Sequence, residues 1–526
     1  MTSDIRSSTP GAPLVQTHGG AVLGLTLPSG IQTFRGIPFA APPVRDLRWK
    51  PPQPVSAWSG VRPADRFDQQ AMQARVFGDM MFRNAGISED CLYLNVWTPA
   101  GATPEAAYPV LVYIHGGGFV AGDGSEPRYD GESMARRDVV VVTLTHRLGV
   151  FGFFSHPELT AESARRASGN YGHLDQVAAL EWVRDNIMQF GGDPTQVTLA
   201  GESAGSFSVI ALMASPLARG LFARAIGESG ACFGKRAPVV ALAESERQGE
   251  AFATSIGVAS LQELRARSAT ELLEAAGRPG APRFVGTVDG WFHQLPPAAV
   301  FAAGAQANVP LLAGWNSEEM SGRVLLSEEP TPDRVRAVLR EHFAGRAVEA
   351  ERVYPVSTAA QAAQSLTDLA GDRFIGYATW KWLEEHTRTC GQSVYRYLYA
   401  HPRPAPVEAG VTPNLAGGVT RDGDAPPPPP STGAVHSAEI EYALGNLPLN
   451  PVFAWTPDDF AVSRIMQEYF LNFIRAGDPN GVGLPEWPVG RPDASGQVMR
   501  LRIDRVPSAE PDPRARYLFL DATDGR

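Results

Sequence analysis

Cysteine and charge are both scarce in this chain, and each shortage excludes a class of protein. Among 526 residues there are only three cysteines, Cys91, Cys232 and Cys390, too few and too scattered for a disulfide framework or a cysteine metal cluster. Charged residues make up 19% of the chain, and 46 Lys and Arg stand against 56 Asp and Glu, so the net charge of -10 leaves no basic surplus for binding phosphates. We expect reduced thiols and no nucleic-acid partner.

Long apolar runs are missing as well. The sequence nowhere reaches the roughly 20 consecutive apolar residues that span a bilayer, and its nearest runs are 110–114 and 139–142. Residues 1–20 are polar and contain Pro10 and Pro13, without the apolar centre of a signal peptide. The sequence therefore predicts no membrane span and a cytoplasmic location.

Apolar residues nevertheless make up 44% of the chain, which is enough for a sizeable core. They gather in short β-branched runs, which are typical of strands buried on both faces of a parallel sheet. Segments with helical spacing, such as 175–190, separate several of these runs. The alternation predicts an α/β fold with a large, mostly parallel central sheet and helices on both faces. The expected strands are 110–115, 139–144, 197–201, 223–227, 309–314 and 394–398.

We expect a single elaborated domain over residues 15–526, preceded by a flexible tail over 1–14. Two segments with helical periodicity, about 238–300 and 325–390, are expected as insertions that lie over the active-site end of the sheet. Residues 402–432 contain five consecutive prolines and little core material, which predicts an exposed loop.

The sharpest motif is Gly-Glu-Ser-Ala-Gly over 201–205, which lies between a strand-like run and a helix-like run that begins near Ser206. A serine on such a strand-to-helix turn needs small neighbours, because the turn strains the backbone and leaves no room for side chains. Gly201 and Gly205 meet that need. The context favours Ser203 as a nucleophile.

A second glycine-rich segment, His-Gly-Gly-Gly-Phe over 115–119, directly follows an expected strand. Acyl transfer places negative charge on the carbonyl oxygen, and N–H donors already aimed at that oxygen stabilise the charge. Consecutive glycines let backbone N–H groups face a ligand, although they also permit close packing alone.

A serine nucleophile needs a base. The order serine, acid, histidine, which is typical of such sheets, leaves the histidines beyond residue 300. His436 lies in a loop that enters an apolar segment. His342 and His386 lie in charged, helical stretches and His401 borders the proline-rich loop, so we expect these three to be solvated.

The acid must hold the imidazole in one tautomer and stabilise it once it is protonated. Glu318 and Glu319 follow the expected strand 309–314, and the carboxyl end of a strand is where such sheets place catalytic groups. Local chemistry alone leaves the choice between these two open, and a solvated turn is the other interpretation.

Further recognisable segments extend from about residue 15 to the C-terminus. They are 34–40 (FRGIPFA), 88–96 (SEDCLYLNV), 169–172 (GNYG), 174–176 (LDQ), 190–194 (FGGDP) and 445–447 (GNL). Together with 197–205, these segments resemble the type-B carboxylesterases of the α/β-hydrolase fold, a family that includes bacterial para-nitrobenzyl esterases and the cholinesterases.

The resemblance implies the α/β-hydrolase fold and a serine esterase that hydrolyses small-molecule carboxylic esters through an acyl-enzyme, without a metal or organic cofactor. Matched position by position, it makes Ser203 the nucleophile, His436 the base and Glu319 the acid, because the family places an acidic residue directly before its catalytic glutamate. Met320 departs from the glycine that usually follows.

The resemblance also assigns supporting groups around this triad, namely three backbone donors for the oxyanion and two polar side chains. The donors are the N–H groups of Gly117, Gly118 and Ala204, and the polar side chains are Glu202 and Ser229.

The walls of the substrate pocket are a separate expectation. Phe119 and Trp315 adjoin predicted catalytic segments, so we expect them to line the substrate pocket.

Departures from the family pattern are also informative. Many secreted members pair the cysteine that corresponds to Cys91 with one about twenty residues earlier, but 67–81 contains no cysteine, which implies a free thiol. The choline-binding tryptophan of cholinesterases has no counterpart in 67–90, which disfavours a quaternary-ammonium substrate. His146 and His173 stand where relatives commonly have Tyr and Leu, and we interpret both as packing residues.

Three alternatives remain beside ester hydrolysis. The same triad would serve a carbamate, an aryl amide or transesterification with a bulky alcohol. A non-catalytic binding relative of the fold is the second alternative, and a scaffold whose glycine-rich loops are only structural is the third. The oligomeric state is not predicted.

Overall fold

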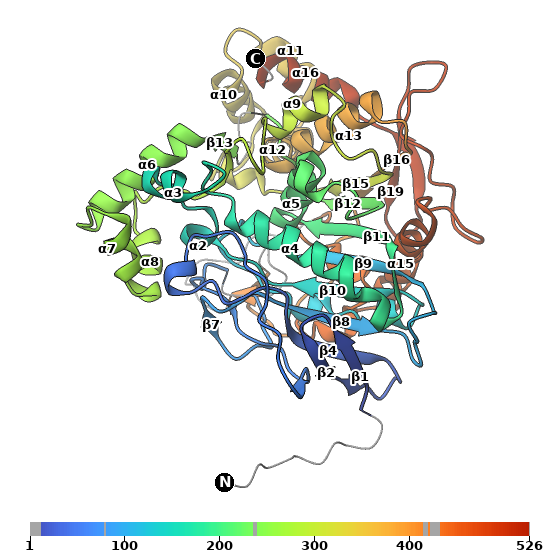
Figure 1. Cartoon of the computed structure of the whole chain (residues 1–526). Helices are drawn as coiled ribbons and strands as arrows, with labels where there is room; N and C mark the ends of the chain where they lie inside the picture. The colour runs from blue at the N-terminus through green and yellow to red at the C-terminus, as the bar shows by residue number, and fades with distance from the viewer. Residues whose placement is uncertain (1–11, 78–79, 235–238, 414–418, 421–431, 525–526) are drawn as a thin grey trace.

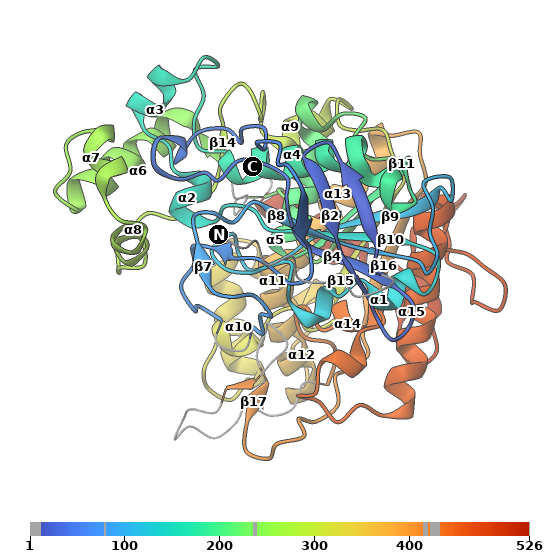
Figure 2. The same ribbon diagram turned by 60° about the horizontal axis from the view of Figure 1, so that its bottom comes forward.

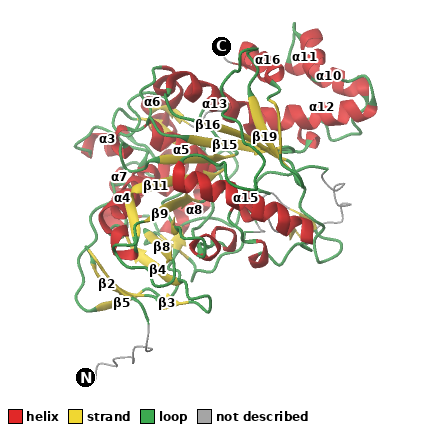
Figure 3. Cartoon of the chain, turned by 90° about the vertical axis from the view of Figure 1, so that its right-hand side faces the viewer, coloured by secondary structure: helices red, strands yellow, loops and turns green. Residues whose placement is uncertain are grey.

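The computed structural model describes residues 12–77, 80–234, 239–413, 419–420 and 432–524. A large twisted sheet runs through the centre of the molecule and helices cover both of its faces (Figures 1 and 3). In spatial order its eleven strands are β20 (Ser508–Pro511), β19 (Met499–Ile503), β16 (Val394–Tyr399), β15 (Leu311–Asn316), β12 (Arg224–Glu228), β11 (Gly192–Glu202), β9 (Tyr108–Ile114), β10 (Val140–Leu144), β8 (Tyr93–Thr98), β4 (Gln32–Pro38) and β3 (Leu25–Thr26).

The middle of the sheet is parallel and its two ends are antiparallel. Strands β19 to β10 in this order pair in parallel, whereas β8, β4 and β3 at one end and β20 at the other pair antiparallel to their neighbours. The six strands expected from β-branched runs all belong to the parallel part, so the predicted fold class is confirmed, with mixed pairing at the ends.

Each face of the sheet carries its own apolar core. Along β9, Val110, Val112 and Ile114 pack into one cluster, whereas Leu111 and Tyr113 pack into the other. This alternation is what a strand with two buried faces requires, because successive side chains point to opposite sides. Helices α4 (Tyr171–Asn186), α5 (Ala204–Ala214), α9 (Pro297–Ala302) and α13 (Tyr377–Thr389) cover the first face, and α15 (Pro457–Ala476) packs on the second (Figure 3).

Two groups of helices lie away from the sheet. Figures 1 and 2 show one group beyond the end of α2, and Figures 1 and 3 show the other beside the C-terminal helix. Apart from the C-terminal helix, these helices fall within the segments expected as helical insertions. The first group is α6 (Leu242–Ser255), α7 (Leu261–Ala266) and α8 (Ala269–Ala276), and the second is α10 (Pro332–His342), α11 (Ala347–Val353) and α12 (Ala359–Gly371) with α16 (Arg514–Asp524).

The remaining elements are short. Small sheets pair β1 with β2 and β5, β6 with β7, β13 with β14, and β17 with β18. Their bounds are β1 (Leu14–Thr17), β2 (Gly20–Leu23), β5 (Val61–Pro63), β6 (Gln70–Ala71), β7 (Ile87–Ser88), β13 (Val239–Ala241), β14 (Gly286–Val288), β17 (Thr412–Pro413) and β18 (Val419–Thr420), and the short helices are α1 (Glu132–Ala135), α2 (Gly149–Phe153), α3 (Pro157–Glu162) and α14 (Ile440–Ala443).

Several expectations about exposed segments need correction. His386 and His401 are buried rather than solvated, because each ring has an internal partner: His386 Nε2 lies 2.9 Å from the carbonyl oxygen of Val309, and His401 Nε2 lies 2.9 Å from Asp459 Oδ1. The expected tail falls mostly on residues 1–11, outside the described residues, and strand β1 already begins within it.

The expected proline-rich loop lies partly outside the described residues, since its segments 414–418 and 421–431 are not among them. Across the described ranges, no helix combines the length and the apolar character that crossing a membrane requires.

Candidate active site

Ser203 sits on the turn between β11 and α5, with φ 52° and ψ −118°. Residues with a side chain rarely adopt this conformation, so the surrounding structure must hold it. Steric crowding requires glycine two residues before and two residues after Ser203. A Cβ on Gly205 would lie 2.1 Å from the carbonyl oxygen of Ile114, and one on Gly201 would lie 2.5 Å from the carbonyl carbon of Gly205.

Ser203, His436 and Glu319 come together from three distant segments. Ser203 Oγ lies 3.0 Å from His436 Nε2, and His436 Nδ1 lies 2.6 Å from Glu319 Oε2. Glu319 follows β15, and His436 precedes α14. A hydroxyl that contacts an imidazole, whose other nitrogen meets a carboxylate, is arranged for activation as a nucleophile.

Neighbouring groups fix the carboxylate of Glu319. Its Oε1 accepts hydrogen bonds from Ser229 Oγ at 2.6 Å and from the backbone N–H of Asn316 at 2.7 Å, which leaves Oε2 for His436. Glu318 is directed elsewhere, because its Oε1 accepts from Thr432 Oγ at 2.5 Å. The geometry therefore distinguishes the two glutamates that local sequence left open.

The glycine-rich loop after β9 faces the same space. Gly117 has φ 113° and Gly118 has φ 65°, and a Cβ on Gly117 would lie 2.1 Å from the carbonyl oxygen of Ala121. Gly117, Gly118 and Ala204 all line the cavity that contains Ser203, and their N–H groups donate to no other described residue. Three free donors beside the hydroxyl can bind an oxyanion.

The cavity has a volume of about 380 Å³ and is lined mainly by apolar side chains. Phe119 lines it. Its other apolar walls come from the β6–β7 loop, from α5, from the segment after β15 and from a π-helical turn, η6 (Asp372–Gly376). These apolar side chains are Phe77, Met80, Phe207, Met320, Phe374 and Ile375, and the guanidinium groups of Arg128 and Arg283 also line the cavity.

Trp315 does not line this cavity, which corrects the expectation drawn from its position in the sequence. It lines a separate cavity, together with Glu318 and Arg516. Its indole packs edge-on against the ring of Tyr517, with 5.5 Å between the ring centroids, because its side chain leaves β15 toward α16. A neighbour in sequence to a catalytic segment can thus point away from the pocket.

His146 and His173 lie in the packing around the glycine-rich loop. His146 stacks on His115 with 4.8 Å between the ring centroids, and His173 meets the ring of Phe119 edge-on at 5.5 Å. Burial lowers the pKa of His173 to about 4, so this ring is neutral at physiological pH. Neither ring lies among the residues that line the cavity.

Three more buried carboxyl groups surround the triad: Glu202, Glu228 and Glu439. Glu202 Oε1 lies 3.2 Å from His436 Nε2, and burial raises the pKa of Glu202 to about 8. Burial also raises the pKa of Glu439 to about 7 and that of Glu228 well above its usual value. Burial alone would lower the pKa of His436, but Glu202 and Glu319 raise it to about 9.

Phe374 is a site residue that the sequence did not reveal. Its ring lies edge-on to the ring of His436, with 5.1 Å between the centroids. The π-helical turn that carries Phe374 lies within a segment that reads as ordinary helix, and such turns are frequent at functional sites. In the described part of the chain, no group of three or more His, Cys, Asp or Glu side chains is arranged to hold a metal ion.

Known proteins resemble this chain over most of its length. The model of the carboxylesterase family matches residues 11–515. The fumonisin B1 esterase of Sphingopyxis macrogoltabida is 35% identical over 507 residues, which cover 92% of this chain and 85% of the relative, and carboxylesterase 1C of Mus musculus is 34% identical over 90% of this chain and 87% of its own length.

Solved structures show the same likeness. The carboxylesterase EST55 of Geobacillus stearothermophilus superimposes with a TM-score of 0.78 at 30% identity, covering 96% of this chain and 99% of its own. A PNB esterase superimposes equally well, with a TM-score of 0.78 at 30% identity and coverage of 97% and 99%.

Proposed function

Because the chain belongs to the carboxylesterase family, it hydrolyses carboxylic esters, and we propose that it does so through an acyl-enzyme formed on Ser203. The contact from Ser203 Oγ through the His436 ring to Glu319 is the observation that carries this proposal. In this arrangement Ser203 is the nucleophile, His436 is the base, and Glu319 stabilises the protonated base.

In the first half of the reaction, Ser203 Oγ attacks the ester carbonyl while His436 Nε2 takes the hydroxyl proton. Glu319 holds Nδ1–H and stabilises the imidazolium that results. The N–H groups of Gly117, Gly118 and Ala204 bind the oxyanion. The tetrahedral intermediate then collapses, His436 returns the proton to the departing alcohol, and the acyl group remains on Ser203.

In the second half, a water molecule replaces the alcohol. His436 takes a proton from the water as it attacks the acyl carbonyl, and the imidazolium then returns this proton to Ser203 Oγ as the carboxylic acid leaves. Apart from this water molecule and the substrate, these steps use only side chains and backbone groups of the chain itself. Carbamates and aryl amides would pass through the same steps, and product analysis distinguishes them.

The cavity supports a substrate whose reacting end is apolar or aromatic. Phe119, Phe207 and Phe374 supply flat apolar walls close to Ser203. A volume of about 380 Å³ lies at the lower end of the range for small-molecule sites. We therefore expect compact acyl or alcohol groups to be accepted better than long, branched ones.

A cytoplasmic location is also part of this proposal. Cys91, Cys232 and Cys390 are all free and buried, and burial raises the pKa of each thiol. Free thiols suit a reducing compartment. Cell fractionation with antibodies against the native protein tests it, and recovery outside the cytoplasm would contradict it.

The decisive experiment is hydrolysis of a para-nitrophenyl acyl series by the native protein and by Ser203→Ala. We expect the variant to lose activity by roughly five orders of magnitude while its thermal unfolding stays unchanged within a few degrees. Ser206→Ala is the matched control, because this serine lies three residues further on and its Oγ donates to the carbonyl oxygen of Gly230. A fully active Ser203→Ala variant would refute the assignment.

A further inference from the structure

The residue that follows the proposed base has an unusual backbone. Ser437 has φ 62°, in the left-handed region, and is only 3% exposed. A residue with a Cβ pays about 1–2 kcal/mol in this conformation, so the surroundings must hold it there. The peptide of Ser437 is joined directly to His436, and its orientation therefore sets the direction in which the imidazole ring projects.

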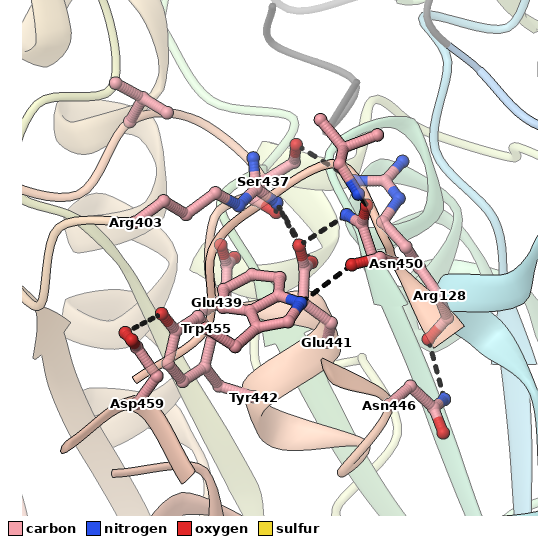
Figure 4. Close-up of polar contacts among 12 residues, drawn as sticks. Arg128, Arg403, Ser437, Glu439, Glu441, Tyr442, Asn446, Asn450, Trp455 and Asp459 are labelled. Carbon is pink, nitrogen blue, oxygen red and sulfur yellow. Dashed lines mark hydrogen bonds and ion pairs between the residues drawn. The ribbon is translucent and has the colours of Figure 1, made fainter. Parts of the chain in front are cut away.

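Arg403 holds this peptide from one side (Figure 4). Its Nη2 donates to the carbonyl oxygen of Ser437 at 2.8 Å and to Glu441 Oε2 at 2.9 Å. Glu441 lies on α14, four residues after Ser437, and its Oε1 accepts from Asn450 Nδ2 at 3.2 Å. The guanidinium group of Arg403 thus ties the peptide of Ser437 to helix α14, which follows it in the sequence.

Arg128 holds Ser437 as well, by a contact with the hydroxyl group of Ser437. Its Nη1 donates to Ser437 Oγ at 3.2 Å, and its Nε donates to Glu126 Oε1 at 2.8 Å. The backbone around Arg128 is fixed in turn, because Asn446 Nδ2 donates to its carbonyl oxygen at 2.9 Å (Figure 4). The side chain of Arg128 is 1% exposed.

We propose that Arg403 and Arg128 form a clamp on Ser437 that positions His436 for proton transfer to and from Ser203. This inference rests on the proposed function, and it adds two positioning residues that touch neither Ser203 nor Glu319. A loop without the clamp would relax from the left-handed conformation, and the 3.0 Å contact between His436 Nε2 and Ser203 Oγ would lengthen. A misplacement of about 1 Å is enough to lower a rate about 100-fold.

The geometry explains why arginine serves here. Nη2 of Arg403 donates to both a carbonyl oxygen and a carboxylate, and the guanidinium group lies over the ring of Phe453, with 5.2 Å between Cζ and the ring centroid. A lysine can supply a charged donor, but it has no planar group to cover the ring while it makes these contacts. Arg403→Lys should therefore restore part of the function that Arg403→Met loses.

The test compares Arg403→Met and Arg403→Lys with Arg396→Met in para-nitrophenyl acetate hydrolysis. Arg396 is the matched control, because its side chain is also buried, at 1% exposed against 5% for Arg403, and is ion-paired with Glu384 at 2.6 Å, but it makes no contact with the segment around His436. We expect kcat to fall 10- to 100-fold in Arg403→Met and about 3- to 10-fold in Arg403→Lys, with KM changed less than about threefold. Arg396→Met should lose stability but keep kcat per folded molecule.

A second measurement does not depend on ester hydrolysis. The proton on His436 Nδ1, held by Glu319 at 2.6 Å, should give a downfield proton NMR resonance that Glu319→Gln abolishes. We expect this resonance to shift or broaden in Arg403→Met and to persist in Arg396→Met.

An unchanged kcat and an unchanged resonance in Arg403→Met would overturn the clamp. If Arg403→Met does not fold, Arg403→Lys decides: a kcat equal to that of the native protein would overturn it. Failure of the proposed function itself would appear separately, as native activity that survives Ser203→Ala.

Discussion

Replacing Glu202 with Gln should move the acid limb of the pH profile of kcat/KM to lower pH. His436 must be neutral to act as a base, and Glu202 stabilises its protonated form. Without the carboxylate, the imidazolium loses a partner and the pKa of His436 falls from its raised value of about 9. The neutral base is then available at lower pH.

The size of the shift follows from the distance. Unit charges 3.2 Å apart attract by about 1.3 kcal/mol even with the screening of bulk water, which corresponds to about one pH unit. The buried site screens these two charges less than water does, so we expect the midpoint of the acid limb to fall by one to two pH units. At high pH, loss of the Glu202 carboxylate destabilises the imidazolium that forms during attack, so the high-pH plateau of kcat/KM should fall about tenfold.

The assay is kcat/KM for para-nitrophenyl acetate from pH 5 to pH 10, with Glu228→Gln as the control. Glu228 Oε1 accepts a hydrogen bond from Tyr113 OH at 3.1 Å, and among the described residues its carboxyl group makes no contact with His436, so an amide of the same shape should leave the limb in place. A midpoint for Glu202→Gln that stays fixed or moves upward would refute the reasoning.

Three further substitutions probe other parts of the site. Glu319→Gln should lower kcat by about 10³ to 10⁴ at neutral pH, because an amide cannot stabilise the imidazolium, and a loss below tenfold in steady-state kinetics would contradict this. Gly117→Ala should lower kcat by about 10² or more, since its Cβ would lie 2.1 Å from the carbonyl oxygen of Ala121, and native kcat in the same assay would show that the loop can shift without cost. Arg283 lines the cavity without an ion pair to any described residue, so Arg283→Ala should raise KM about two- to fivefold for esters with a carboxylate on the acyl chain and leave neutral esters unchanged. Equal effects on paired charged and neutral substrates would assign Arg283 no part in selectivity.

The sequence predicted the parallel strands well because each is a short run buried on both faces, and that property is local. The serine turn and the glycine loop were also visible, since crowding at Gly205 and Gly117 demands glycine at fixed positions. The antiparallel ends of the sheet were not predicted, because strand direction depends on the path of the whole chain.

Contacts between distant segments explain what the sequence did not reveal. Nothing in the sequence near Arg403 marks it as a partner of Ser437, and nothing near Phe374 marks it as a neighbour of His436, since each contact forms only in the folded chain. The burial of His386 was missed for a related reason: its helix is charged on one face, and the opposite face, which carries the histidine, packs on α9.

The site is assembled from segments that lie far apart in the sequence, and this bears on how the molecule acquires its activity. Ser203 and His436 are 233 residues apart, and the contact between Arg128 and Ser437 spans 309 residues. Contacts of such long range form late in folding, because the entropy of closing a long loop is lost before the contact can stabilise the chain. During refolding, esterase activity should thus return after the helical circular dichroism signal, and the catalytic rate becomes a reporter of the last assembly step.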